Sequence, residues 1–441
     1  MDGVHNIVKY FIVVYIVAGL LTTKSFAQEL NGDIETLSLE EAVTKAVRSN
    51  PFLKAAEWKE KSAKEKMVQS GSWMDPVLKF GLLNVPAESF EFDLEPMTGK
   101  QIALTQQIPF PGKLGAKKKA AEQEWHAVSA DRLELERMLI HQVKNSYFDL
   151  YTIDKSIGII SENIDLTTRF VEIAERRYSV GTGLQQDVLK AQVEKSKFEE
   201  QLINLGFKRE KATAVLNALM NRAPDTPILV SDELLPTKID LTEEELMEKA
   251  KKLRPALKAA RHRIDRNERM MDFSKKLKLP DLGVAMAYTQ RNELTGPMMG
   301  KGADFLSMSV AFSLPIKPGN RQSSKVEESK AAVRMAQESY NNILNNVKRD
   351  IRIMFADVAK AKELIVLYEN QILPQAEQSL NSALSGYQVN KVDFITLLNN
   401  QITLFNFRIN YYRIISEHEK SIAGIEAAVG VNLTRGDSKN E

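Results

Sequence analysis

Four stretches of this sequence occur twice, in the same order and at nearly the same spacing. Residues 39–56 resemble residues 243–260, and the spacing between the two copies stays between 204 and 209 residues along the chain. The paired landmarks are Pro51 with Pro255, Asp75-Pro76 with Pro280-Asp281, Gly112 with Gly319, and Tyr178 with Tyr387. Chance similarity between helices would not keep these landmarks in order, so a duplication explains the pattern better.

Each copy predicts the same order of elements. A helix, at 38–70 and again at 242–277, precedes alternating stretches and then a very long helical region. At about 1.5 Å per residue, a helix over 116–179 would extend roughly 95 Å. The second copy repeats this region at 322–386, where Pro374 indicates a kink or a boundary. We therefore expect long antiparallel helical hairpins in two repeats, residues 28–235 and 236–433, followed by a polar tail at 434–441.

The clearest predicted strand is 305–314. Large apolar residues such as Met308 and Phe312 alternate there with small ones, mostly serines. A strand of about ten residues with this pattern suits lipid on one face and water on the other. Its expected partners are 76–84, 100–108 and 281–289. A soluble β-sandwich is the alternative. Four strands cannot close a barrel, so the membrane interpretation requires several copies of the chain.

The N-terminus resembles an export signal. Lys9 precedes an apolar run from Tyr10 to Leu21, and small residues follow up to Ala27. We expect a signal peptide at 1–27, because the run is shorter than the roughly 20 residues of a membrane anchor. The chain has no cysteine, so its stability comes from packing or oligomerisation. Its net charge of +2 offers no electrostatic basis for binding nucleic acid.

Several stretches together resemble one family, the TolC family of outer-membrane efflux proteins. They are SLEEAVTKAVRSNP, QQIPFPGKLG, RRYSVGTGLQQDVLKAQ and LPQAEQSLNSALSGYQVNKVDFITLLNNQ. The resemblance covers about residues 36–433 and includes the duplication. It implies a mainly α-helical chain with a transmembrane β-barrel. Three copies would form a homotrimer with a 12-stranded barrel among outer-membrane lipid and a 12-helix α-barrel in the periplasm.

The same resemblance implies a function and partners. The chain would be the passive exit duct of a tripartite efflux system, completed by a periplasmic adaptor (membrane fusion) protein and an inner-membrane pump. QQIPFPGKLG with LPQAEQSL points to the heavy-metal-efflux branch, whose members work with resistance-nodulation-division pumps. Drug efflux and type I protein secretion are the alternatives within transport. A periplasmic coiled-coil structural or adaptor protein without a barrel is the alternative from another class.

The resemblance also places functional residues at the two helix reversals. Val180, Gly181 and Thr182 match the family's adaptor-docking motif, although glycine is also common in an ordinary turn. The second reversal has Val389, Asn390 and Lys391 instead, and Asn390 can still take the left-handed conformation that Gly provides.

An aperture at the periplasmic entrance is implied just past each reversal. Asp187 occupies the position of a family acid, and three copies would form a carboxylate ring. Lys190 stands where the family often has a second acid, so an i,i+3 pair would partly neutralise the ring. The matching positions in the second copy, Thr396 and Asn399, are neutral. The alternative is an ordinary solvated helix face.

No catalytic, cofactor or metal-binding motif is present in the sequence. His126 and His141 share one predicted helix but lie fifteen residues apart, while His262 and His418 are isolated in the sequence. Metal ligands on one helix need convergent spacing such as i,i+4. Met298-Met299 could be soft ligands, but methionines in such chains usually pack. The sequence therefore predicts a channel and no enzyme.

Overall fold

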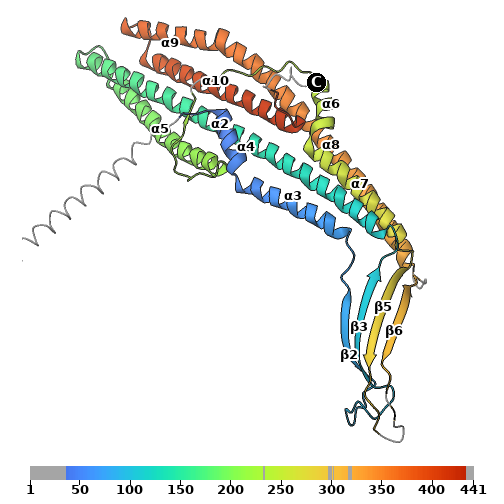
Figure 1. The fold of residues 1–441 in the computed structure, drawn as a ribbon. Helices are drawn as coiled ribbons and strands as arrows, with labels where there is room; N and C mark the ends of the chain where they lie inside the picture. Colours follow the sequence, from blue (N-terminus) through green and yellow to red (C-terminus); the bar gives the residue numbers. More distant parts are fainter. Residues whose placement is uncertain (1–35, 232–233, 296–299, 301, 316–319, 434–441) are drawn as a thin grey trace, which may run out of the picture. The chain divides into compact units, whose positions relative to one another are not determined.

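The computed structural model describes residues 36–231, 234–295, 300, 302–315 and 320–433. The predicted signal peptide at 1–27, the tail at 434–441 and Met298-Met299 lie outside these residues. Figure 1 shows the long helices and the larger β-sheet, which has four strands. In the part of the chain that is described, no helix combines the length and apolarity needed to cross a membrane.

The elements follow one order twice. Two helices, two strands and then long helices occur in each half, and a short parallel pair, β1 (Thr36–Leu37) and β4 (Leu229–Val230), is additional. The first set is α2 (Leu39–Ser49), α3 (Pro51–Ser70), β2 (Val77–Leu83), β3 (Gly99–Ile108), α4 (Lys113–Ser179) and α5 (Gln185–Leu219). The second is α6 (Glu243–Leu253), α7 (Pro255–Lys276), β5 (Asp281–Gln290), β6 (Phe305–Ser313), α8 (Arg321–Leu367), a π-helical turn (Tyr368–Ile372), α9 (Leu373–Gln388) and α10 (Phe394–Val429). The repeat boundaries at 28–235 and 236–433 stay a prediction.

Proline positions explain where the helices divide. The single helix expected at 38–70 is wrong, because Asn50 is extended and Pro51 begins a new helix. Pro255 divides the region expected at 242–277 in the same way, after the extended Arg254. A residue before proline avoids the helical region, and proline is well tolerated at the first helical position. The boundary expected at Pro374 is confirmed, since α9 begins at Leu373 after the π-helical turn.

The chain forms two compact units, each with segments from both halves. Among the described residues, the first unit comprises those within 36–49, 142–236 and 360–420, and the second those within 50–141, 237–359 and 421–433. In the first unit, α4, α5 and α10 pack through aromatic and aliphatic side chains. Phe198 and Phe405 meet edge to face at 4.9 Å between ring centres, against Ile159 and Ile160. Buried Gln401 on α10 donates a hydrogen bond to Thr167 on α4 at 2.7 Å.

The second unit contains an antiparallel sheet in the order β2-β3-β5-β6. Directly paired residues share a face of the sheet. One face carries Phe80, Ile102, Tyr288 and Leu306 in one row across all four strands. The next residues along each strand bring small and polar groups such as Ala103 and Ser307 to the opposite face. The alternation predicted from the sequence is therefore confirmed, and the strands begin and end within two residues of the expected ranges.

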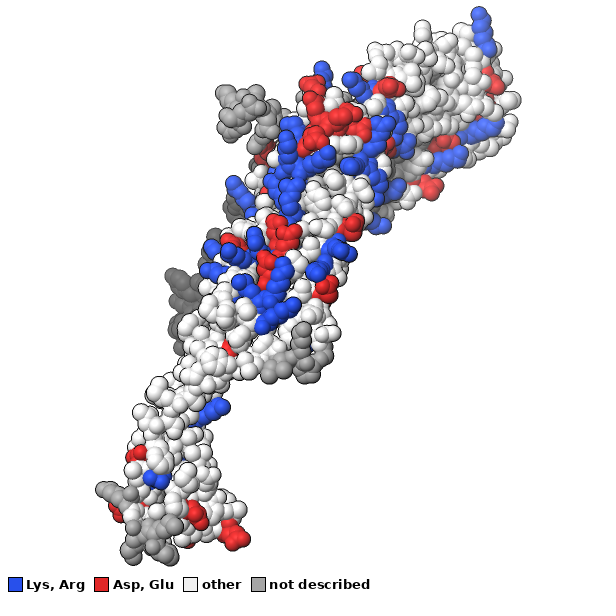
Figure 2. Space-filling view, turned by 90° about the vertical axis from the view of Figure 1, so that its right-hand side faces the viewer, with Lys and Arg blue, Asp and Glu red and all other residues white. Residues whose placement is uncertain are grey.

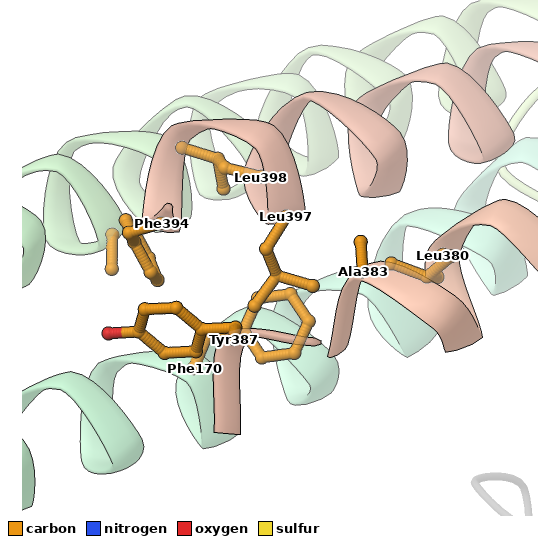
Figure 3. Close-up of a cluster of buried hydrophobic side chains, with 8 residues drawn as sticks. Phe170, Leu380, Ala383, Tyr387, Phe394, Leu397 and Leu398 are labelled. Atoms are coloured by element: carbon orange, nitrogen blue, oxygen red, sulfur yellow. The ribbon is translucent and has the colours of Figure 1, made fainter. Parts of the chain in front are cut away.

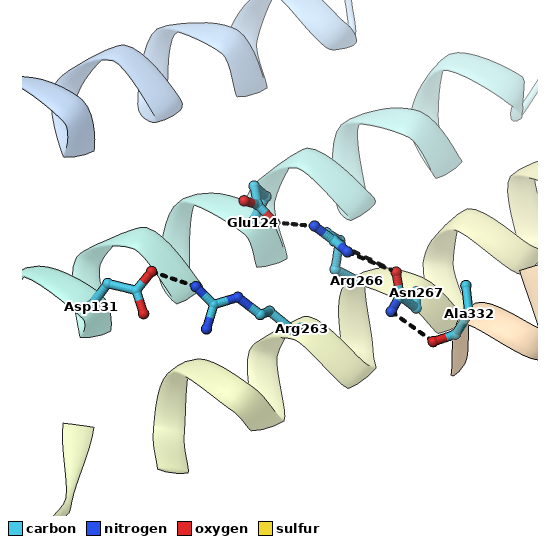
Figure 4. Close-up of polar contacts among 6 residues, drawn as sticks. All are labelled: Glu124, Asp131, Arg263, Arg266, Asn267 and Ala332. Atoms are coloured by element: carbon cyan, nitrogen blue, oxygen red, sulfur yellow. Dashed lines mark hydrogen bonds and ion pairs between the residues drawn. The ribbon is translucent and has the colours of Figure 1, made fainter. Parts of the chain in front are cut away.

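The helices of the second unit are joined by ion pairs between α4 and α7. Arg266 meets Glu124 at 2.7 Å, and Arg263 pairs with Asp131 (Figure 4). Arg254, just before α7, meets Glu134 at 3.2 Å. The sequence numbers rise on α7 as they fall on α4, so the two helices run antiparallel. The rings of His126 and His262 also meet across this interface, 5.2 Å apart. His262, which is isolated in the sequence, therefore has a histidine neighbour in the fold, because the two residues belong to different helices.

Candidate functional site at the helix reversals

The first reversal, between α4 and α5, is closed by hydrogen bonds to one carbonyl. The amides of Thr182 and Gly183 donate to the carbonyl of Arg177 at 2.9 and 3.0 Å, and the Thr182 hydroxyl donates to it at 3.2 Å. Gly181 adopts a φ of +72°, in the left-handed region that glycine tolerates. A Cβ on Gly183 would lie 2.9 Å from the Cβ of Arg177. Gly181 is therefore needed for its left-handed backbone conformation, and Gly183 is needed because the backbone lies close to Arg177.

The second reversal, between α9 and α10, is also a tight turn, but different residues form it. Asn390 takes the left-handed conformation at a φ of 59°, as its sequence position predicts. The amide of Lys391 donates to the carbonyl of Gly386 at 2.8 Å. Gly386 is needed for close approach here, because a Cβ would lie 2.6 Å from Val392. Both reversals are therefore tight and defined by their backbones.

The two helices that leave the reversals begin differently. Asp393 precedes α10, and its carboxylate accepts a hydrogen bond from the amide of Thr396 at 2.8 Å. Hydrogen bonds from Thr396 lower the pKa of Asp393, and the positive charge of Lys190 adds to the effect. By contrast, α5 begins after Leu184, which makes no side-chain cap, and carries Asp187 in its first turn. An acid there is favoured by the positive end of the helix dipole.

Arg177 joins the two reversals. Its guanidinium lies over the ring of Tyr387, 4.5 Å from the ring centre, and one of its N–H groups donates to the carbonyl of Tyr387. A second N–H group reaches the carbonyl of Thr182 at 3.5 Å. Burial raises the pKa of the Tyr387 hydroxyl, with a smaller opposing effect from the Arg177 charge. One side chain thus contacts both reversals.

An apolar cluster underlies this contact. Figure 3 shows Tyr387 and Phe394 in the same group as Phe170 and Leu397, and the members of the group come from α4, α5, α9 and α10. The rings of Tyr387 and Phe394 are 5.5 Å apart, and Phe170 is 1% exposed. Because Tyr387 belongs to both the cluster and the contact with Arg177, the surface loops are anchored to a buried core.

The docking residues expected from the sequence lie at the surface. Val180 and Val389 are 71% and 61% exposed, which is high for valine, and no atom lies within 4 Å of a Cβ placed on Gly181. Thr182, Asn390 and Lys391 are also exposed. The first reversal therefore presents small or apolar groups to solvent, whereas the second presents Val389 beside the polar Asn390 and the charged Lys391.

The expected aperture residues are only partly brought together. A groove of about 390 Å³ between the reversals is lined by Thr182, Asp187, Lys190, Asn390 and Lys391, among others. Thr396 and Asn399 are exposed on α10 and are not part of its lining. Within the described residues, no ion pair joins Asp187 to Lys190, and Lys190 instead acts on Asp393 through its charge. The suggested neutralisation of Asp187 stays a prediction.

Two residues of this site were missed in the sequence. Arg177 lies 210 residues from Tyr387 in the sequence, so nothing local indicated their contact. Asp393 had a signal, because an Asp directly before a helical stretch is typical of an N-cap. For metals, no group of three or more His, Cys, Asp or Glu side chains placed to hold an ion occurs in the described ranges.

Comparison with known proteins identifies the family. A family model described as outer membrane efflux protein matches residues 42–222 and 246–431. The chain belongs to this family, and the resemblance expected from the sequence is confirmed. As a member of this family, the chain is an outer-membrane protein of efflux.

Particular relatives place the chain within the family. It is 24% identical over 403 residues to the cobalt-zinc-cadmium resistance protein CzcC of Cupriavidus metallidurans, covering 89% of this chain and 90% of that protein. The crystal structure of VceC from Vibrio cholerae matches with a TM-score of 0.75 and 19% identity, over 90% of this chain and 96% of VceC. CusC matches with a TM-score of 0.75 and 14% identity, over 89% and 92% of the two chains. The CusC structure describes the formation of a transmembrane channel.

Proposed function

We propose that three copies of this chain form the passive exit duct of a tripartite efflux system. The observation that carries the proposal is the four-stranded sheet. Its outer strands, β2 and β6, each pair on one side only within the described chain. An exposed strand edge with an apolar face invites pairing with another chain. Pairing β6 of one copy with β2 of the next would close twelve strands into a barrel.

The apolar face of the sheet supports a lipid environment. Phe80, Leu306, Met308 and Phe312 are between 62% and 74% exposed in the single chain. On the surface in Figure 2, charged side chains are sparse over the strands and dense over the helices. Burial of apolar area contributes about 25 cal/mol per Å², so such a face is stabilised by lipid contact. The small residues of the opposite face would line the lumen.

Engineered cysteines can test the closure of the barrel. Because the chain has no cysteine, any cross-link comes from the introduced pair. Lys79→Cys on β2 is combined in turn with Ser307→Cys, Ser309→Cys or Ala311→Cys on β6, all on the small-residue face. We expect one of these pairs to give disulfide-linked trimers in outer membranes. A pair between Ala103→Cys and Ser307→Cys is the matched control, since β3 and β6 are not neighbours. Absence of trimers from all three test pairs contradicts the closure.

The long helices would then continue as a 12-helix periplasmic α-barrel, with the helix reversals at its end. We propose that Val180, Gly181, Thr182, Val389, Asn390 and Lys391 dock a periplasmic adaptor protein. Their exposure and the rigid backbone beneath them support this role, because an adaptor helix can approach a tip with little side chain closely. An inner-membrane pump of the resistance-nodulation-division type would supply the free energy, so the duct itself needs no catalysis or cofactor.

We further propose that Asp187, Lys190, Thr396 and Asn399 border the periplasmic aperture. The position of Asp187 and Lys190 beside the groove between the reversals supports part of this set. Divalent metal cations are the proposed cargo, supported by the name of CzcC, a cobalt-zinc-cadmium resistance protein. Drug efflux and protein secretion remain the alternatives. Metal accumulation in cells lacking the gene, with and without the chain restored, separates metal from drug export.

The proposed division of the chain follows the duplication. Residues 1–27 would be removed as a signal peptide, 28–235 and 236–433 would be the two repeats, and 434–441 a polar tail. The repeated order of helices and strands supports the division. A periplasmic coiled-coil protein without a barrel is the alternative function from another class. It would leave the exposed apolar face of the sheet without a role.

A further inference from the structure

Four helices of the second unit line one pocket. It has a volume of about 450 Å³ and is lined by residues of α3, α4, α7 and α8. Small side chains leave this space open, among them Ala63 on α3, Ala121 on α4 and Ala332 on α8. Figure 4 shows four residues of the lining, Glu124, Arg266, Asn267 and Ala332. Sites for small molecules occupy about 300–1,000 Å³, so the pocket is large enough for one.

The charges that line the pocket do not balance. The lining contains two acidic and four basic side chains. Each acid is paired with a base, Glu124 with Arg266 at 2.7 Å and Glu328 with Lys325 at 2.8 Å. The other two bases are Lys66 on α3 and Lys117 on α4, and both are exposed. Among the described residues, neither ammonium group has an ion-pair partner or a hydrogen-bond acceptor. Two positive charges of the lining are therefore uncompensated.

The buried polar groups of the pocket already bind one another. The Ser329 hydroxyl donates to a backbone carbonyl of its own helix at 2.9 Å. A hydroxyl has one hydrogen, so Ser274 is the donor in its 2.8 Å contact with Ser329. The side chain of Asn267 donates to the carbonyl of Ala332 at 3.1 Å and accepts from Arg266 at 3.0 Å. The two lysines are therefore the charged groups of the lining that are free to bind a ligand.

We propose that this pocket binds an aromatic organic anion, a small molecule with a flat apolar body and one carboxylate or sulfonate group. Met270 and Phe273 on α7 supply apolar surface, and both side chains make favourable contacts with aromatic rings. Lys66 and Lys117 can give the anionic group charge-assisted hydrogen bonds. An organic cation would instead meet uncompensated like charge. The site goes beyond the proposed exit duct and does not depend on it.

Binding of naphthalene-2-sulfonate to the purified full-length protein tests the site. Isothermal titration calorimetry in a non-ionic detergent measures it, and detergent alone gives the blank for uptake into micelles. We expect one sulfonate per chain. Lys66→Gln combined with Lys117→Gln should weaken binding at least tenfold, because two charge-assisted hydrogen bonds are lost. Lys59→Gln combined with Lys119→Gln is the matched control, since it changes the charge of the same two helices equally but outside the lining.

Two further measurements locate the ligand in this pocket. Ala63→Leu should abolish binding, because the larger side chain fills the space between the helices. The uncharged analogue 2-naphthol should bind the wild-type protein at least tenfold more weakly than the sulfonate does. Its affinity should be the same in the double lysine variant, because it has no charge for the lysines to bind.

Folding of the variants is checked by circular dichroism and by their extraction as the same oligomer. In folded variants, unchanged sulfonate affinity after loss of both lysines overturns the proposal. Unchanged affinity in Ala63→Leu also overturns it, because the sulfonate is then bound elsewhere. Absence of binding to the wild-type protein overturns it as well, since a lipid or a neighbouring copy then fills the pocket. No transport is measured, so these results are separate from any failure of the proposed duct.

Discussion

Replacing Arg177 by methionine should loosen the second helix reversal while leaving the first intact. The side chain of Arg177 donates to the carbonyl of Tyr387 and lies over its ring, whereas its backbone carbonyl closes the first reversal. A hydrogen bond from a charged group contributes about 1.5–3 kcal/mol and a partly exposed cation–π contact about 0.5–1 kcal/mol. Because Arg177 is half-buried, screening reduces the sum to about 2 kcal/mol.

Hydrogen exchange of backbone amides measures this loss directly. A decrease of about 2 kcal/mol in the free energy of local opening corresponds to roughly 30-fold faster exchange. We expect that acceleration for the amide of Lys391, which donates to Gly386 in the second reversal. The amides of Thr182 and Gly183 should keep their protection, since their acceptor is the backbone of residue 177. Arg176→Met, at the neighbouring exposed position, is the matched control. Equal exchange of Lys391 in the wild type and in Arg177→Met would refute the reasoning.

Four further predictions concern the same region. Phe170→Ala should lower the free energy of unfolding by about 3–5 kcal/mol, because it leaves a cavity in the buried cluster beneath the reversals. Denaturant titration measures this change. Because the pKa of Asp393 is lowered in the folded protein, its cap stabilises α10 fully above the ordinary carboxyl pKa, and this stabilisation is lost as pH falls through the folded pKa. The exchange of the Lys391 amide should therefore become faster at acid pH, and Asp393→Ala should remove that pH dependence. Val180→Asp should abolish adaptor binding in a pull-down without disturbing the oligomer, and normal binding would remove the docking role. Asp187→Asn should lower cation preference in single-channel conductance; an unchanged reversal potential would count against an aperture ring.

Local chemistry made much of the fold predictable. The serine alternation in 305–314 and the proline-free run after Lys113 specify a strand and a long helix without any tertiary information. The breaks at Pro51 and Pro255 were foreseeable from proline geometry but were hidden by the continuous helical pattern around them. The sequence also indicated the left-handed conformation of Asn390, because few other residues adopt it.

Contacts between distant segments were not predictable in the same way. Arg177 meets Tyr387 only because α4 and α9 end beside each other, and His126 meets His262 only because α4 and α7 run antiparallel. The spacing of residues along one helix cannot predict a contact between two different helices. The aperture residues were also not predictable from local sequence. Asp187 and Lys190 line the groove between the reversals, whereas Thr396 and Asn399 do not. The contacts of individual residues could therefore be assigned only from the tertiary structure, whereas the helices and strands could be predicted from the sequence.

The central claim is that the two free edges of the sheet are closed by other copies of the chain. The most direct measurement is the mass of the protein extracted from outer membranes in detergent, by native mass spectrometry. The proposal predicts a trimer of the mature chain that requires detergent to stay in solution. A monomer that remains soluble without detergent would contradict it.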